Sequence, residues 1–356
     1  MASSIKGNPH HLIFNCFSLH HLLLPSSSSV ATCSLNLFQS PISIYSNISL
    51  VGFLSINCTT VLLFFLFMDF IPGLPDDVAR QCLIRVSYEN FSTIAAVCRV
   101  WKSEVEDPDF FRQRKTAGYT RPVFAMAQAR VVPNRSSGGM KCPKLAYRVT
   151  LLDLETGNWS ELPPVPGFSD GLPMFCQLVG VESELVVVGG WDPDTWEISS
   201  SVFIYNFLSA TWRRGADMPG ARRSFFGCAA SGLERVVYVA GGHDGEKNAL
   251  KSALVYDVAK DEWAPLPDMA RERDECKGVF HRGKFHVIGG YCTEMQGRLE
   301  RSAEAFDFAN WEWDKAEEDF LEDSTCPRTC VDGGDMGCTC VMRVRWWHCR
   351  TPDGKQ

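Results

Sequence analysis

The apolar positions of the chain follow different periods in two regions. In residues 74–116 they recur every three or four positions, which is the spacing of amphipathic helices. Three short helices are predicted there; the first begins at Leu74-Pro75-Asp76-Asp77 and the third ends at Asp107-Pro108. Beyond residue 121, short apolar runs end in glycine pairs, as strands bounded by tight turns do. A small helical region followed by a larger β region is therefore predicted.

The β region contains a repeat with a period of about fifty residues. In each of four units, an apolar or aromatic residue precedes a tryptophan by seven positions, and these tryptophans are Trp159, Trp212, Trp263 and Trp313. Three units also contain an apolar run that ends in a glycine pair, and the pairs are Gly189-Gly190, Gly241-Gly242 and Gly289-Gly290. Repeats of this length that contain strands predict a β-propeller. Glycines would allow the tight turn and the aromatic side chains would fill the space between sheets, so we expect all these residues to be structural.

The glycine pair, Tyr256-Asp257 and Trp263 lie at the spacing of the kelch repeat, and residues 121–334 resemble an array of such repeats. The resemblance is weaker in the first unit, where an aliphatic residue replaces the aromatic one. It implies a mainly β fold, a kelch β-propeller with about four recognisable blades, preceded by a small α-helical domain. Closure in this family normally takes five or six blades, and less than one period follows Trp313. We therefore expect an incomplete propeller with open sheet edges and an atypical tail at residues 335–356.

The helical region, residues 68–116, resembles the F-box. Leu74-Pro75 stands near its start and Cys98-Arg99-Val100-Trp101 near its end, as the F-box pattern requires. F-box domains bind the Skp adaptor, which connects them to a cullin–RING ubiquitin ligase. The resemblance assigns the Skp contact to Leu74, Pro75, Leu83, Ile84 and Val97. A bundle of this size cannot bury all of its apolar side chains; the alternative is that Leu83 and Val97 serve only the internal core.

An F-box followed by kelch repeats resembles a large group of plant F-box/kelch proteins. Members with a start similar to IPGLPDD…CLIRV, residues 71–86 here, control the turnover of enzymes such as phenylalanine ammonia-lyase and of cytokinin-response regulators. The resemblance therefore implies the substrate-recognition subunit of an SCF (Skp–cullin–F-box) E3 ubiquitin ligase, with a protein substrate as the second partner. Ubiquitin-ligase chemistry resides on the cullin–RING partners, so neither a catalytic residue nor a cofactor is expected. The residues themselves do not identify the substrate.

Two other classes of kelch protein lack support in the sequence. Kelch propellers that are copper oxidases need imidazoles and a tyrosine that converge on one metal ion. The histidines of the propeller region and its tail show no paired spacing; they are His243, His281, His286 and His348. A non-ligase or actin-linked kelch scaffold would leave the F-box unexplained.

One face of the propeller is the expected substrate-binding surface. In an antiparallel blade with strands a to d, the b–c loop and the d–a loop emerge at the same end. The b–c loops begin at Trp191, His243 and Tyr291, and the d–a loops carry Arg222, Arg223, Arg271 and Arg273. Arginine and aromatic side chains dominate binding hot spots, so these residues are the substrate-binding candidates. The alternative is that the arginines only pair with neighbouring carboxylates or cap strands.

The composition of the chain limits the classes of partner it can bind and indicates its cellular compartment. The 356 residues suit two or three domains, and a net charge of −7 gives no support for binding nucleic-acid phosphates. The 15 cysteines form no regular framework, which favours free thiols in the cytoplasm or nucleus. Five cysteines near His348 have the spacing C-x3-C-x7-C-x-C-x8-C, which is not a usual zinc pattern, so no metal site is expected.

Residues 1–67 differ from the rest of the chain. Lys6 is the only Lys, Arg, Asp or Glu before Asp69, and the apolar stretch at residues 48–67 is long enough to span a bilayer. One interpretation is a membrane-anchored F-box receptor. The other is that translation starts at Met68 and the leader comes from upstream sequence. We favour the second interpretation, and under both we expect the leader to lie outside the folded core.

Overall fold

The computed structural model describes most of the chain beyond residue 70 and one short segment before it. The described residues are 21–24, 70–136, 143–168, 171–192, 195–231, 234–321, 327, 330–332, 338–342 and 345–348. They belong to two compact units, a helical unit within residues 25–120 and a β unit within residues 1–24 and 121–356. The candidate membrane stretch at residues 48–67 lies outside the described residues. Within the described part, no helix is both long and apolar enough to cross a membrane.

The described part of the helical unit, residues 70–120, contains four α-helices where the sequence predicted three. They are α2 (Asp76–Ile84), α3 (Phe91–Val97), α4 (Arg99–Glu106) and α5 (Pro108–Thr116), and the 3₁₀ turn η1 (Tyr88–Asn90) precedes α3. Asp107-Pro108 ends α4, but it also begins α5. The Asp107 carboxylate accepts a hydrogen bond from the Asp109 N–H at 2.7 Å, and Pro108 occupies a first-turn position that needs no N–H donor. A signal taken only as a helix break is thus also a helix start.

A buried arginine completes the core of the helical unit. Arg114 on α5 is fully buried and donates to the backbone carbonyls of Ile84 and, at 3.0 Å, of Tyr119. Its guanidinium carbon lies 4.6 Å from the centre of the Phe91 ring. Burial lowers the pKa of Arg114 to about 9. Because Ile84 is the last residue of α2, Arg114 supplies a donor to a carbonyl that the helix end leaves without an intrahelical partner.

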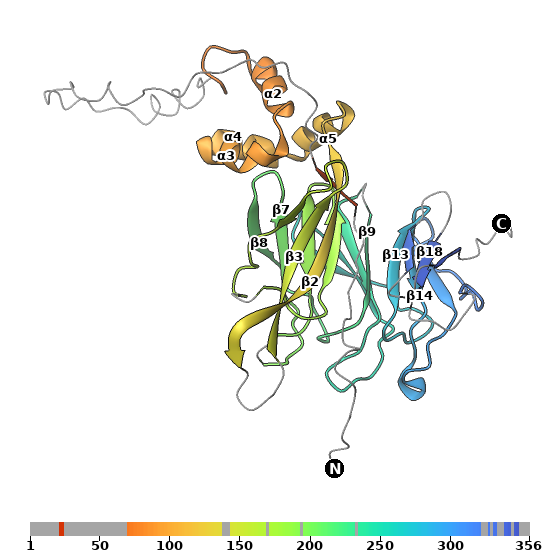
Figure 1. Cartoon of the computed structure of the whole chain (residues 1–356). Coiled ribbons are helices and arrows are strands. Elements are labelled where there is room, and N and C mark those ends of the chain that lie inside the picture. The colour runs from red at the N-terminus through yellow and green to blue at the C-terminus, as the bar shows by residue number, and fades with distance from the viewer. Residues whose placement is uncertain are drawn as a thin grey trace, which may run out of the picture. The chain divides into compact units, whose positions relative to one another are not determined.

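The β unit consists of five antiparallel sheets whose strands follow chain order (Figure 1). The four-stranded sheets are β1 (His21–Leu24), β2 (Arg121–Ser136), β3 (Pro143–Asp153), β4 (Trp159–Glu161); β5 (Gln177–Val181), β6 (Glu184–Val188), β7 (Val202–Asn206), β8 (Thr211–Gly215); β9 (Gly227–Ser231), β10 (Val236–Ala240), β11 (Ala253–Asp257), β12 (Glu262–Leu266); and β13 (Lys277–His281), β14 (Lys284–Ile288), β15 (Ala303–Asp307), β16 (Glu312–Trp313). The fifth sheet contains β17 (Cys330–Asp332), β18 (Cys338–Met342) and β19 (Arg345–His348). A 3₁₀ turn, η2 (Thr293–Met295), lies between β14 and β15.

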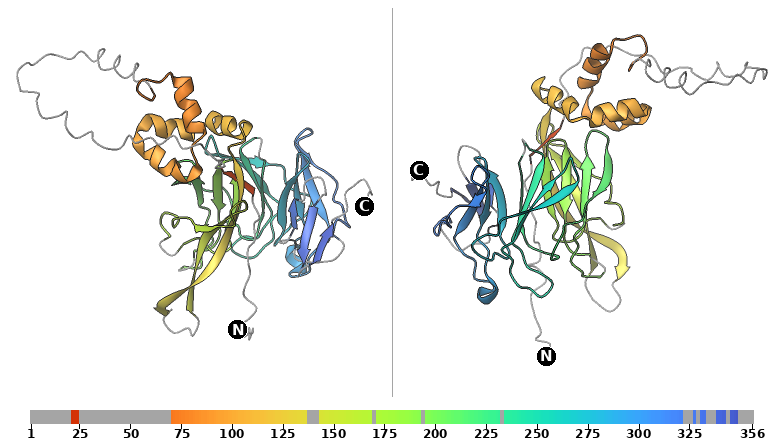
Figure 2. Two further views of the ribbon diagram at one scale, coloured as in Figure 1. Left: turned by 45° about the horizontal axis from the view of Figure 1, so that its top comes forward. Right: turned by 180° about the vertical axis from the view of Figure 1, so that it is seen from behind.

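The first strands of successive sheets lie side by side, as in a propeller. β5 contacts β9, β9 contacts β13, and β13 contacts β17, while β5 also contacts β1 and β2 (Figure 2). Sheets therefore pack on both faces of the middle blades. Every residue of β6 is buried for this reason, and its apolar run is continuous rather than alternating. The predicted fold class, a mainly β chain with four recognisable propeller blades and a small helical domain, is confirmed.

Two segments that the sequence did not assign to the propeller contribute strands. β1 lies in the leader and pairs with β2, from His21 opposite Phe124 to Leu24 opposite Arg121. β18 and β19 lie in the tail beyond residue 335 and pair with each other. The expectation that the leader lies outside the folded core is wrong for β1, and the tail that was expected to be atypical contributes two strands. A sheet edge presents unpaired N–H and C=O groups to any extended segment, so pairing there needs no repeat motif.

Tryptophans on the outer strands connect neighbouring sheets. Each of three indole N–H groups donates to a backbone carbonyl just beyond the last strand of the preceding sheet: Trp212 to Pro163 (3.0 Å), Trp263 to Ala216 (2.9 Å) and Trp313 to Pro267 (2.7 Å). Tyr256 lies opposite Trp263 in the strand register, with ring centres 4.8 Å apart. Trp159, in the first sheet, is 55% exposed. The repeat tryptophans thus act between blades.

Candidate functional site

The helical unit begins with a tight turn that presents Leu74. Gly73 has a φ of +83°, and the Leu74 N–H donates to the Ile71 carbonyl at 2.9 Å. Pro followed by Gly at the central positions is the sequence of a type II turn, in which the second central residue needs positive φ. The Trp101 indole N–H donates to the Phe70 carbonyl at 2.7 Å, which ties the segment before the turn to α4.

The five Skp-contact candidates do not share one environment. Leu74, Pro75 and Val97 are exposed, whereas Leu83 and Ile84 expose only 3% and 1% of their surface. Leu83 and Ile84 lie at the end of α2 and face the internal core. Their assignment to the adaptor surface is therefore corrected, because helical spacing identifies a face but not which partner covers it.

Exposed apolar side chains occur at the beginning of α2 and around the junction of α3 and α4. Leu74, Val78, Val97 and Val100 are 36%, 42%, 54% and 56% exposed, and we call them the F-box apolar surface. Val78 and Val100 were missed by the sequence analysis. No single helical period marks these residues, because Leu74 precedes α2 and the extended Cys98 separates Val97 on α3 from Val100 on α4.

An ion pair connects the helices that carry this surface. Arg80 on α2 contacts the Glu104 carboxylate on α4 through two hydrogen bonds, one of them at 3.0 Å. Two parallel bonds fix the orientation of both side chains more firmly than one bond would. Val78 on α2 and Val100 on α4 therefore belong to helices that this ion pair holds together, while Val97 ends α3.

On the β unit, backbone pairs join each b–c loop to the d–a loop of the same blade. Trp191 pairs with Met174, His243 with Ser224, and Tyr291 with Asp274, each through two N–H···O=C bonds of 2.7–3.0 Å. The second glycine of each pair makes this approach feasible. A Cβ atom on Gly242, for example, would lie 2.4 Å from the Ser224 carbonyl oxygen. The structure therefore brings the predicted b–c residues against the d–a loops.

The residue after each of these d–a positions has a left-handed backbone. Phe175, Phe225 and Glu275 have φ values of +57°, +55° and +54°. None of them is Gly, Asn or Asp, so each conformation costs on the order of 1–2 kcal/mol. The same strain recurs in three blades, which indicates that the surrounding loops impose it. Sequence analysis missed these positions because no glycine marks them.

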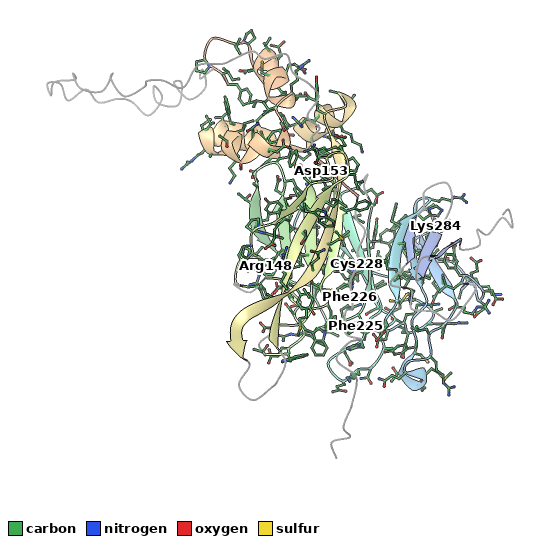
Figure 3. All side chains as sticks on the ribbon, viewed as in Figure 1. Arg148, Asp153, Phe225, Phe226, Cys228 and Lys284 are labelled. Atoms are coloured by element: carbon green, nitrogen blue, oxygen red, sulfur yellow. The ribbon has the colours of Figure 1, made fainter. Side chains whose placement is uncertain are left out.

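A cavity of about 420 Å³ lies among these loops, and we call it the loop-face pocket. It is lined by Trp191, Phe225, His243, Lys247, Asp274, Glu275, Tyr291, Gln296 and Gly297. Figure 3 shows Phe225 at the loop end of its sheet, followed by Phe226 and then by Cys228 on β9. The pocket contains all three b–c candidates and none of the four arginines.

Hydrogen bonds and burial set the protonation of the polar groups in the pocket. His243 Nδ1 lies 2.9 Å from both carboxylate oxygens of Asp274. Ionised carboxylate oxygens only accept, so Nδ1 carries the proton and donates. Burial, together with the nearby carboxylates of Asp274 and Glu275, raises the pKa of the Tyr291 hydroxyl. Tyr291 therefore stays protonated and keeps its donor.

Arg223 and Arg273 lie beneath the loop face rather than on it, since both are buried. Arg223 donates to the Ser252 carbonyl at 3.0 Å, and Arg273 donates to the Gly289 carbonyl at 2.7 Å and to the Glu304 carboxylate at 3.0 Å. Burial lowers the pKa of Arg223 to about 10. Their expected role in substrate binding is corrected: they satisfy carbonyl groups inside their own blades.

The other two arginines are at the surface. Arg271 lies 2.5 Å from a Glu318 oxygen and 3.2 Å from a Glu300 oxygen, so neighbouring carboxylates occupy it. The Arg222 side chain is 64% exposed and lies 3.9 Å from Glu197. Arg222 is therefore the arginine best able to contact a partner.

Metal binding has no support in the described part of the chain. No group of three or more His, Cys, Asp or Glu side chains there is arranged to hold a metal ion. The side chains of the five terminal cysteines lie outside what the structure describes.

The helical unit and the bladed sheets define a class of protein, one that joins an F-box to a kelch propeller. The F-box domain family matches residues 71–113, and the Kelch motif family matches residues 175–219 and 224–270, which contain the second and third sheets. The comparison with known proteins gives the same class.

Similar proteins occur in Arabidopsis thaliana. The F-box/kelch-repeat protein At1g80440 is 55% identical over 272 residues, which is 76% of each chain. The F-box/kelch-repeat protein At1g15670 is 53% identical over 292 residues, 79% of this chain and 81% of that protein. The F-box/kelch-repeat protein SKIP20 is 34% identical over 284 residues, 70% of this chain and 66% of that protein. The chain belongs to the plant F-box/kelch-repeat proteins.

Proposed function

We propose that this chain is the substrate-recognition subunit of an SCF-type E3 ubiquitin ligase. The F-box, residues 68–116, docks the Skp adaptor and through it the cullin–RING ligase. The kelch repeats, residues 121–334, bind a protein that is then ubiquitinated and degraded. The chain itself performs no catalysis, because F-box/kelch proteins are generally adaptors and the ligase chemistry takes place on the cullin–RING partner.

The observation that supports this proposal best is the F-box apolar surface. Four large apolar side chains are at least one-third exposed within a short helical unit. Burying one such side chain completely is worth about 1.5–3 kcal/mol, so a partner that covers the surface gains substantial free energy. Leu74, Pro75 and Val97 remain our candidates for this contact.

The proposal is tested by replacing Leu74 and Pro75 together with Ala and measuring binding of a purified Skp adaptor by calorimetry. Two contact residues that each contribute about 1 kcal/mol would together weaken binding roughly thirtyfold. Leu154→Ala is the matched control, because Leu154 is an exposed leucine of the β unit and its loss should not change adaptor binding. Unchanged binding by a folded double variant would contradict the F-box assignment and favour a non-ligase kelch scaffold.

The substrate is proposed to bind at the loop face of the propeller, where Trp191, His243, Tyr291 and Arg222 lie. By family resemblance, phenylalanine ammonia-lyase or a cytokinin-response regulator is a candidate substrate, and the cytoplasm or nucleus is the proposed compartment. Affinity capture of the full chain from plant cells, followed by mass spectrometry, should recover a Skp adaptor together with a second protein. Recovery of the second protein should fall when the loop face is altered, while recovery of the adaptor should not.

The leader requires a separate test because β1 lies within it. Removing residues 48–67 alone eliminates the candidate membrane stretch and keeps His21–Leu24 available for pairing with β2. We expect this shortened chain and the full chain to fractionate alike and to bind the Skp adaptor equally. Carbonate-resistant membrane association of the full chain, lost in the shortened chain, would instead support a membrane-anchored receptor.

A further inference from the structure

The loop-face pocket is built from two sets of repeat-equivalent positions. The first residues of three b–c loops, Trp191, His243 and Tyr291, contribute one set. The strained d–a residues Phe225 and Glu275 contribute the other. In the next blade, Glu275 occupies the position that corresponds to Phe225, so a carboxylate replaces an aromatic ring there. Aromatic surfaces and an acidic group are therefore held together by the repeat itself.

The aromatic side chains of the pocket are held in place before any ligand arrives. The Trp191 indole N–H donates to Ser224 Oγ, and the rings of His243 and Phe225 have centres 5.4 Å apart. Phe225 also packs on Phe175, with ring centres 5.1 Å apart. Preorganised groups lose little entropy on binding, which is a property of recognition sites.

The charges of the pocket are mainly negative. Asp274 is 2% exposed, and the neighbouring Glu275 is half-buried. Burial raises the pKa of the Tyr291 hydroxyl, and the carboxylates of Asp274 and Glu275 act in the same direction. Lys247 is the one Lys or Arg among the described lining residues, and its own side chain is exposed. A ligand that enters the pocket therefore meets aromatic faces and the half-buried Glu275, with the Asp274 carboxylate buried beneath them.

We propose that the loop-face pocket binds a lysine or arginine side chain of the substrate protein. A cation placed over an aromatic face gains about 0.5–2 kcal/mol, that is, roughly twofold to thirtyfold in affinity. A charge-assisted hydrogen bond to Glu275 adds to this attraction. A volume of about 420 Å³ lies within the usual range of ligand pockets and admits one such side chain with part of its backbone. The inference rests on the proposed function, because it takes the occupant to be a segment of the substrate.

Small peptides test the pocket without knowledge of the substrate. Acetyl-Gly-Arg-Gly-amide and acetyl-Gly-Lys-Gly-amide are titrated into the full chain bound to its Skp adaptor, with acetyl-Gly-Glu-Gly-amide and acetyl-Gly-Leu-Gly-amide as comparisons. We expect saturable, weak binding of the cationic peptides and at least tenfold weaker binding of the other two. Comparing the affinities of the Arg and Lys peptides shows which of the two cationic side chains the pocket prefers.

Variants localise the binding site. Glu275→Gln keeps the shape of the side chain and removes its charge. We expect it to weaken the binding of the cationic peptides roughly tenfold. Trp191→Leu should weaken the binding of the same peptides several-fold, because it removes an aromatic face. Glu294→Gln is the matched control, because Glu294 is an exposed carboxylate of the neighbouring loop that does not line the pocket. Lys247→Ala should strengthen cationic binding about twofold, since it removes a like charge.

Two results would overturn this inference while leaving the proposed function intact, because Skp binding is measured in the same samples. One is preferential binding of the Glu peptide that is lost in Lys247→Ala, which would make the pocket an anion site. The other is no difference between cationic and neutral peptides in a chain that binds Skp normally. Failure of the unaltered chain to bind Skp would instead contradict the proposed function, and the same peptides titrated into the chain alone would still report on the pocket.

Discussion

The helical unit exposes large apolar side chains of a kind that the inner strands of the middle blades bury. Leu74, Val78, Val97 and Val100 are exposed within one short helical segment, whereas every residue of β6 and four of the five in β10 are buried. The difference follows from how many neighbouring elements cover each face of a helix or strand. Middle blades are covered on both faces by neighbouring sheets, while a bundle of four short helices has too little interior to cover its own apolar residues.

The comparison also separates two kinds of recognition. Under the proposed function, the helical unit offers an apolar surface to a fixed partner, the Skp adaptor. The β unit instead offers a pocket with hydrogen-bonded and charged groups, which suits selection among many proteins. In the β unit, the buried strands of the middle blades support the loops, and loops held by a rigid scaffold commonly carry specificity.

The largest expected effect lies in the packed loops of the β unit. Gly242→Ala would place a Cβ 2.4 Å from the Ser224 carbonyl oxygen at a φ of +82°, and we expect it to lower the free energy of unfolding by about 3 kcal/mol or more. Gly245→Ala is the matched control, since a Cβ there meets no atom within 4 Å. Urea unfolding followed by tryptophan fluorescence measures both. If both variants lower the free energy of unfolding by the same small amount, the loops around Gly242 can move to admit the added methyl group.

The next effect separates core from surface within the helical unit. Leu83→Ala should destabilise this unit by about 2–4 kcal/mol, because Leu83 is buried and its loss leaves a cavity. Val97→Ala should change stability by less than about 0.5 kcal/mol, yet weaken Skp binding. Thermal unfolding by circular dichroism and adaptor calorimetry report the two quantities. A large loss of stability in Val97→Ala would place Val97 in the core instead.

A smaller effect distinguishes tryptophans between blades from the one in the first sheet. Trp263→Phe removes the indole hydrogen bond to the Ala216 carbonyl, which should cost about 1 kcal/mol of stability. Trp159→Phe should cost less, because Trp159 is 55% exposed. Urea unfolding of the two variants gives the comparison. If Trp159→Phe proves as destabilising as Trp263→Phe, the interblade hydrogen bond is not what the repeat tryptophan contributes.

The smallest effect concerns pH and the fourth blade. Burial lowers the pKa of His286 below its usual 6.5, and the nearby His281 acts in the same direction. The folded state therefore binds fewer protons than the unfolded state just below pH 6.5, so stability falls as the pH drops through this range. Unfolding free energies at about pH 7.5 and 5.5 should differ less in His286→Phe than in the unaltered chain. An unchanged difference would assign the acid sensitivity to other groups.

Much of the fold was predictable because its signals are local and repeated. The glycine pairs and the Tyr256–Trp263 spacing recur at nearly constant intervals, and each recurrence confirms the period. The same periodicity predicted that Trp191, His243 and Tyr291 would share a loop face, and all three line one pocket. In the helical region, the spacing predicted helices, but it did not reveal that Asp107-Pro108 starts a further helix.

The candidate site was only partly predictable, and its arginines show why. Arg222 and Arg223 are adjacent in sequence, yet the Arg222 side chain is 64% exposed and Arg223 is buried. Neighbours on a chain point in different directions, and only the folded loop decides which of them turns towards the Ser252 carbonyl. The strained backbone of Phe225 and Glu275 also leaves no signature in residue type.

Short-range spacing and side-chain volume are local properties, so they were enough to predict the repeat, the order of the helical and β units, and the residues that must be small or aromatic. Tertiary structure alone decided that Leu83 and Ile84 are core, that Arg223 and Arg273 bond to backbone carbonyls, and that leader residues 21–24 pair with β2. These features depend on contacts between segments distant in sequence. Burial and hydrogen-bond satisfaction are properties of the assembled neighbours, which no local pattern encodes.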